Sequence, residues 1–175
     1  MPFYAIMFDP NGNGTGPHSY AEEPAAYPAN ELPCTEAQAQ TPMLWSNVNG
    51  VLTPNLAQAQ AQQIALIQSS ASQAEQAPVS LTLSSGVTAS FGMTPHDWTK
   101  IVGIYAKYVA KGATLPSGYT IPDITGKAQA VTVSDIENLM NAGESQIQAT
   151  IVKAQTLIGQ IEAATTVSGV QAIVW

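Results

Sequence analysis

The chain has 175 residues, of which 45% are hydrophobic and 10% are charged, and its formal net charge is -7. Its five basic residues are all lysine, whereas a nucleic-acid-binding protein needs a basic face to displace counterions from phosphates. The longest apolar runs are far too short to span a bilayer. The composition therefore excludes nucleic acid and a membrane as partners. The start Met1–Tyr4 lacks a basic segment, so we expect no signal peptide and a cytosolic chain.

The first 55 residues are predicted to form a small β-rich module. Phe3 to Phe8 is an apolar, aromatic run typical of a strand, and Asp9 to Gly16 is rich in turn-forming residues. An extended loop is expected next, because prolines recur through it at Pro24, Pro28 and Pro33.

Between residues 35 and 78 the sequence contains two local structural motifs and one segment of biased amino-acid composition. Thr35 to Gln38 fits a capping box and predicts a short helix. Met43 to Leu52 predicts a β-hairpin, because the central Asn49-Gly50 supplies the two positive φ angles of a type I′ turn. Residues 56–78, rich in alanine and glutamine, predict a connecting helix that ends at Pro78, where we place the domain boundary.

Residues 79–175 are predicted to form a C-terminal α+β domain. Apolar and polar residues alternate from Val79 to Phe91 around a Ser-Gly turn, which predicts a β-hairpin with one buried face. Thr94 is a helix N-cap, and the apolar positions from Trp98 to Val109 share one helical face. Gly112 supplies the stop of this short helix.

A long amphipathic helix is the last predicted element. Ser134 to Glu137 fits a capping box, and apolar residues recur every three or four positions from Ile136 to Ile161, over roughly 45 Å at 1.5 Å per residue. The stripe is narrow, as in a coiled-coil seam. Its candidate packing seam comprises Ile147, Ile151 and Ile158. The terminal Trp175 is expected to dock, because a large aromatic is costly to leave in water.

Residues that commonly carry chemistry are few and scattered. The glycine-rich run from Asn11 to Gly16 lacks the Gly-Lys-Ser/Thr ending of a phosphate loop. The two histidines, His18 and His96, are far apart in the sequence, and Cys34 has no identifiable base partner. We therefore expect no catalytic site, no metal site and no cofactor.

Three aromatic residues outside the predicted helices are candidates for contact with a partner. Trp45 borders the predicted hairpin, and Tyr20 and Tyr27 lie in the predicted loop. Exposed aromatic rings of this kind suit either a protein surface or a sugar ring.

The chain resembles two groups of phage proteins. From Leu83 to Trp175 the order of hairpin, short helix, extended connection and long helix, with the closing phrases Ile161–Ala164 and Val170–Ile173, resembles a C-terminal domain of unknown function that recurs in phage tail-fibre genes. The N-terminal half resembles the leading part of phage tail-fibre assembly proteins. The phrases that carry this likeness are Phe3–Ile6, Pro28–Asn30, Thr35–Gln40 and Leu44–Gly50.

The resemblance implies a non-enzymatic chaperone that assists folding or trimerisation of the receptor-binding end of a phage tail-fibre protein. It would act in the host bacterial cytoplasm, and either leaves the fibre or remains attached at the virion tail-fibre tip. A host-glycan-binding tip subunit and a purely structural tail component are the alternatives. The narrow seam also allows self-association through the long helices.

Overall fold

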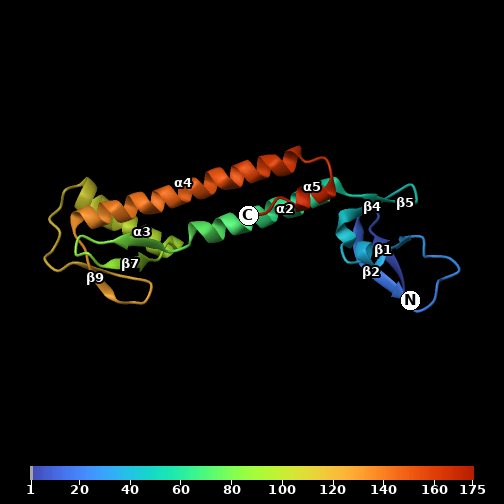
Figure 1. Ribbon diagram of the computed structural model, residues 1–175, viewed down its shortest axis with the longest axis horizontal. Helices are drawn as coiled ribbons and strands as arrows, with labels where there is room; N and C mark the ends of the chain where they lie inside the picture. The colour runs from blue at the N-terminus through green and yellow to red at the C-terminus, as the bar shows by residue number, and fades with distance from the viewer. Residues whose placement is uncertain (1) are drawn as a thin grey trace. The chain divides into compact units, whose positions relative to one another are not determined.

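The structure is a computed structural model that describes residues 2–175 and has an α+β fold, as the sequence predicts (Figure 1). Its contacts divide the chain into two units. The N-terminal unit comprises Met1–Ile67 and Leu157–Trp175, and the second unit comprises Gln68–Thr156. This division differs from the boundary placed at Pro78, because the end of the chain packs with the first 67 residues.

The N-terminal unit contains a three-stranded antiparallel sheet. Its strands are β1 (Phe3–Phe8), β2 (Gly14–Tyr20) and β3 (Glu31–Cys34), in the order β2-β1-β3. β1 is the predicted strand, whereas β2 and β3 fall where a turn and an extended loop were expected. Pro17 in β2 and Pro33 in β3 argued against strands in the sequence. Both strands lie at the edges of the sheet, and an edge strand tolerates proline because one side of it needs no hydrogen bond.

The local motifs that follow the sheet form as predicted. Thr35 caps α1 (Glu36–Ala39) in a complete capping box with Gln38. After the 3₁₀ helix η1 (Pro42–Leu44), β4 (Trp45–Val48) and β5 (Val51–Pro54) form the predicted hairpin. Its turn residues have positive φ angles, 55° at Asn49 and 81° at Gly50.

The C-terminal segment completes the N-terminal unit. It contains α5 (Val167–Gln171), whose Val170 is 0% exposed. The first part of α2 (Leu56–Glu75) lies beside it, because Gln63 Nε2 donates a 2.6 Å hydrogen bond to the carbonyl oxygen of Ile173. The Gln60 amide also donates to carbonyl oxygens at the end of α4 (Val133–Ala163), namely those of Ile161, Glu162 and Ala164.

The second unit is built around an apolar core. It contains the predicted hairpin of β6 (Val79–Thr82) and β7 (Thr88–Phe91), and the helix α3 (Pro95–Tyr105), capped by Thr94. A π-helical turn η2 (Ala106–Ala110) continues α3, and a second small hairpin follows in β8 (Thr120–Pro122) and β9 (Ala128–Ala130). The most deeply buried side chains of this core include Phe91, Ile136 and Leu139.

Helix α4 begins two residues earlier than its predicted capping box. Thr132 Oγ1 accepts a hydrogen bond from the Asp135 amide, and the Asp135 carboxylate accepts bonds from the Thr132 amide and hydroxyl. Asp135 also accepts bonds from the amide and hydroxyl of Ser84, each at 2.8 Å. The prediction of a cap at Ser134 was therefore wrong, because a contact with the β6–β7 turn favours Asp135 as the capping acid.

Gly143 allows α4 to lie close to the core of this unit. A Cβ atom at this position would meet Met93 Cε and would lie 2.5 Å from Trp98 Cζ3. The element that approaches α4 at this position is α3, through its Trp98.

Candidate partner-binding surfaces

The tip of the β4–β5 hairpin exposes apolar side chains. Val48 and Val51 are partners in the register of this antiparallel pair, so their side chains lie side by side on one face. They are 50% and 62% exposed, and Met43, in the η1 turn that precedes β4, is 49% exposed. This exposed apolar tip belongs to the hairpin that begins at the predicted contact residue Trp45, but the valines themselves were not singled out from the sequence.

Trp45 lies on the opposite face of the hairpin from Val48, because successive strand residues alternate between faces. Its side chain is half-buried and lines a cavity of about 480 Å³ within the N-terminal unit. Leu44 and Leu56 line the same cavity, together with residues 165–168 of the returning C-terminal segment. Trp45 therefore has a packing role, and its loss should affect stability as well as any partner contact.

Tyr20 and Tyr27 are brought together, with ring centroids 5.7 Å apart and an edge-to-face angle of 86°. Tyr20 also lies 4.4 Å from the His18 ring, and its hydroxyl donates a 2.6 Å hydrogen bond to Glu31 Oε2. His18 Nδ1 lies 3.0 Å from Glu31 Oε1. Both tyrosines are half-buried, and Tyr20 is engaged by neighbours on its ring and its hydroxyl.

The register of the sheet explains how this cluster forms. Glu31 is on β3 and His18 is on β2, so the Glu31 side chain must cross the central strand β1 to reach His18. Ala5 pairs with His18 on that central strand and is 0% exposed. A small residue at this position leaves room for the carboxylate above it.

The hydrogen bonds shift the titration of both partners. Burial raises the pKa of Glu31, but hydrogen bonds from Tyr20 and His18 and the charge on His18 outweigh burial and leave this pKa below its ordinary value. The hydrogen bond to Glu31 is the main cause that raises the pKa of Tyr20 to about 12. The arrangement stabilises an ionised Glu31, and it joins the two edge strands of the sheet.

The predicted packing seam on α4 is half-buried along its length. Ile147 and Ile151 belong to the second unit and Ile158 to the N-terminal unit, and all three have intermediate exposure. Gln146 donates hydrogen bonds to carbonyl oxygens of Ala74 and Ala77, which places the end of α2 beside this part of α4. The seam therefore contributes to packing within the chain, and its use in self-association stays a prediction.

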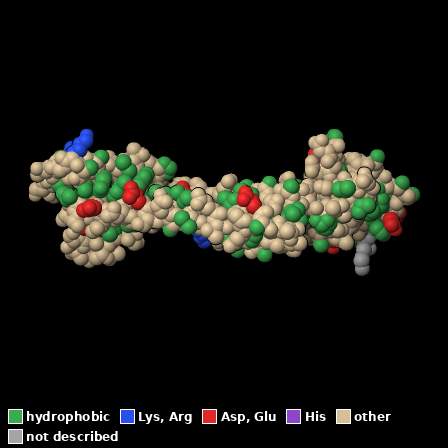
Figure 2. All heavy atoms as spheres, turned by 90° about the horizontal axis from the view of Figure 1, so that it is seen from above, with side chains coloured by type: hydrophobic (Ala, Val, Ile, Leu, Met, Phe, Trp, Pro, Cys, Tyr) green, Lys and Arg blue, Asp and Glu red, His purple; other side chains and the backbone are tan. Residues whose placement is uncertain are grey.

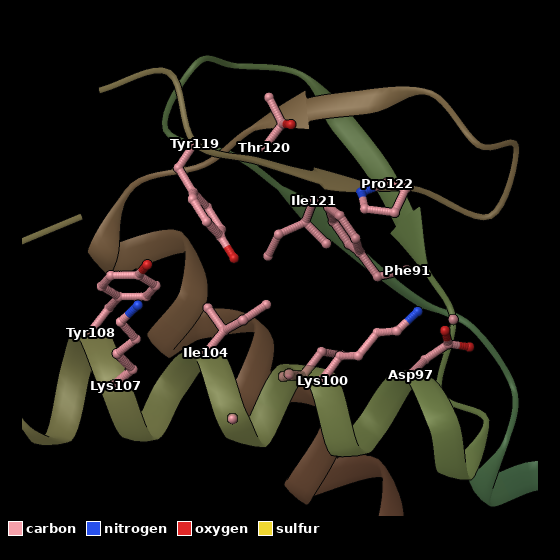
Figure 3. A pocket seen from close by; sticks show the side chains of 13 residues that line it. Phe91, Asp97, Lys100, Ile104, Lys107, Tyr108, Tyr119, Thr120, Ile121 and Pro122 are labelled. Atoms are coloured by element: carbon pink, nitrogen blue, oxygen red, sulfur yellow. The ribbon is translucent and has the colours of Figure 1, made fainter. Parts of the chain in front are cut away.

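A pocket in the second unit was not predicted from the sequence. It has a volume of about 520 Å³ and lies between α3 with η2 on one side and β7 with β8 on the other (Figure 3). Figure 3 shows Ile104, Ile121 and Tyr119 pointing toward one another across it. Its other labelled lining side chains are Phe91, Asp97, Lys100, Lys107, Tyr108, Thr120 and Pro122.

Lysines border this pocket at two places. Lys107 lies beside Tyr108, with its ammonium group 4.8 Å from the ring centroid, and Lys100 extends toward the end occupied by Asp97. Tyr108 in turn packs against Tyr119, with ring centroids 5.4 Å apart. The seven-residue spacing of the lysines on one helical face is the signal in the sequence that could have indicated this site.

Two further titratable side chains, those of Asp123 and Cys34, have pKa values shifted by their structural surroundings. Hydrogen bonds from Thr125 and Gln129 lower the pKa of Asp123 to about 2, in the turn between β8 and β9. Burial raises the pKa of the Cys34 thiol. Within residues 2–175, no group of three or more histidine, cysteine or acidic side chains is placed to hold a metal ion.

In the part of the chain that the structure describes, none of the helices is both long and apolar enough to cross a membrane. A scan against protein-family models found no matching family, and searches of curated proteins and of solved structures found no match either.

Proposed function

We propose that this chain is a phage tail-fibre assembly chaperone that binds the receptor-binding end of a fibre protein and assists its folding and trimerisation. The resemblance of its sequence to tail-fibre assembly proteins supports this proposal. The observation that carries it is the exposed apolar tip of the β4–β5 hairpin, formed by Val48 and Val51.

The hairpin offers a surface suited to a β-rich client. β4 and β5 form a separate two-stranded sheet, and β4 is bridged to Asn13 through Ser46. Among residues 2–175, no strand pairs with the outer edge of β5. β-rich proteins fold slowly through long-range pairing, and their unpaired edges aggregate. A hairpin with an unpaired edge strand and an apolar tip can cover an aggregation-prone edge of the client until the trimer closes.

The chain as a whole is poor in charge. Charged residues make up only 10% of the chain, and Figure 2 shows few red or blue side chains among the hydrophobic and uncharged polar ones on the face in view (Figure 2). Low charge reduces the desolvation cost of burying a surface against a partner, so contact with another protein is favoured.

The test is to express the cognate fibre with and without this chain and to measure the soluble trimer by size-exclusion chromatography with light scattering. The informative variant is Val48→Thr with Val51→Thr, which keeps the β-branched shape and removes apolar surface. Val87→Thr is the matched control, because Val87 is 43% exposed in a hairpin turn of the other unit. We expect the double variant to lose at least half of the soluble trimer and the control to retain it.

A fibre that is equally soluble and trimeric without the chain would refute the chaperone function. Binding of the isolated chain to host surface glycans would then favour the tip subunit, and co-purification with intact virions without glycan binding would favour a structural tail component. Equal activity of the double variant and the wild type would remove the hairpin tip as the contact surface.

A further inference from the structure

The pocket of the second unit combines an apolar floor with an excess of positive charge. Ile101, which lines it, is 4% exposed, and Phe91 is 1% exposed, so the floor belongs to the core and is preformed. The volume of about 520 Å³ lies within the range of about 300–1,000 Å³ that is typical of ligand sites. The pocket is thus large enough for one bulky apolar side chain and its flanking backbone.

The charges around this floor are unusual for this chain. Two of its five lysines, Lys100 and Lys107, line this one pocket, although the formal net charge is -7. Within the described part of the chain, 2–175, neither lysine forms an ion pair. Asp97 also lines the pocket, so its two lysines and one aspartate leave a net charge of +1, which attracts an anionic partner that most of the surface repels.

The spacing of the lysines restricts the kind of ligand. They lie seven residues apart, or about 10 Å along the helix at 1.5 Å per residue. Two carboxylates at a similar spacing can each approach one ammonium group, so both lysines are neutralised without converging on a single anion. The complementary ligand carries two separated negative charges with an apolar group between them.

We propose that this pocket binds an acidic peptide segment of a partner protein, with an apolar side chain on the floor and a carboxylate at each lysine. In an extended peptide, residues i, i+2 and i+4 share one face and span about 13 Å, which the flexible lysine side chains can match. This inference depends on the proposed function in one respect, which is that the partner protein is taken to be the fibre.

Asp97 provides a test of the proposed electrostatic attraction between the pocket and an acidic peptide. One of its carboxylate oxygens accepts a 2.6 Å hydrogen bond from Thr94 Oγ1, and it lines the end of the pocket toward which Lys100 extends (Figure 3). Asp97→Asn keeps an oxygen for this hydrogen bond and removes the negative charge. It should therefore raise the affinity for an acidic peptide.

The experiment is fluorescence anisotropy with the full-length chain at low salt. The probe is fluorescein-labelled Asp-Gly-Phe-Gly-Asp, and the control peptides are Lys-Gly-Phe-Gly-Lys and Asp-Gly-Ser-Gly-Asp. We expect the acidic phenylalanine peptide to bind more tightly than either control, and its affinity to fall with added salt.

The variant series assigns the binding to the pocket. Lys100→Gln with Lys107→Gln should weaken binding of the probe by about tenfold, whereas Asp97→Asn should strengthen it by about twofold. Lys127→Gln is the matched control, because Lys127 is an exposed lysine outside this pocket, and it should change the affinity by less than about twofold.

Absence of binding at about 1 mM chain, or equal loss in the double and control variants, would overturn the proposal. The result is separable from that of the chaperone test. Peptide binding without any effect on fibre solubility would refute the chaperone function alone, and fibre rescue without peptide binding would refute the pocket assignment alone.

Discussion

Helix α4 contains two glycines that should respond to alanine with opposite signs. At Gly143 the new methyl group would meet Met93 Cε and lie 2.5 Å from Trp98 Cζ3, far inside van der Waals contact. At Gly159 nothing lies within 4 Å of the position of a Cβ atom. The two substitutions are chemically identical and differ only in what surrounds them.

The expected magnitudes follow from two opposing contributions. Alanine in place of glycine in a helix interior stabilises by about 1 kcal/mol, because it loses less backbone entropy on folding. Overpacking of a filled core costs about 1–3 kcal/mol, and the rigid Trp98 ring must move. Because the approach of 2.5 Å is so close, the overpacking cost lies in the upper part of that range, at about 2–3 kcal/mol. Gly143→Ala should therefore destabilise by about 1–2 kcal/mol net, whereas Gly159→Ala should stabilise by about 0.5–1 kcal/mol.

Urea unfolding followed by circular dichroism and by tryptophan fluorescence measures both variants. The free energy of unfolding should fall in Gly143→Ala and rise in Gly159→Ala. The tryptophan fluorescence of folded Gly143→Ala should also differ from that of the folded wild type, because Trp98 is displaced. A Gly143→Ala chain at least as stable as the wild type would show that α4 does not pack on Trp98 as described.

The other predictions concern the Glu31 cluster and the α4 seam. The pKa of Glu31 is lowered in the folded chain, so its contribution to stability is present above its unfolded pKa and is lost as the pH falls through its folded pKa. Glu31→Gln should lower the Tm at pH 7 and make the decrease in Tm between pH 7 and pH 3 smaller than in the wild type; parallel curves would contradict this reasoning. Ile151→Asp places a charge at a half-buried position and should cost about 1–2 kcal/mol in urea unfolding, whereas Val152→Asp, at a position 59% exposed, should cost about 0.5 kcal/mol or less. Equal effects of these two neighbouring substitutions would mean that the seam faces solvent.

The sequence by itself determined the features that depend on a few neighbouring residues. The cap at Thr35, the cap at Thr94 and the Asn49-Gly50 turn each involve hydrogen bonds or φ angles within four residues, so their chemistry can be recognised without knowing the fold. The α+β class and the long helix were predicted for a related reason, since the alternation of apolar and polar residues is a local property.

Of the candidate contact residues, the sequence identified the region around Trp45 but not which side chains it exposes. The alternation of faces in β4 turns Trp45 toward a cavity and Val48 toward solvent, and this orientation depends on where the C-terminal segment returns. Tyr20 and Tyr27 were expected in a loop, whereas Tyr20 belongs to β2 and bonds to Glu31.

Only the tertiary structure decided the features that join distant residues. The sequences of β2 and β3 have low strand propensity, and these segments form strands because each pairs with one edge of β1. Asp135 rather than Glu137 completes the cap of α4, because Ser84, which is 51 residues away, donates to the same carboxylate. The pocket with Lys100 and Lys107 likewise needs β7 and β8 beside α3. Such contacts join residues that no local pattern links, because their partners are chosen by packing.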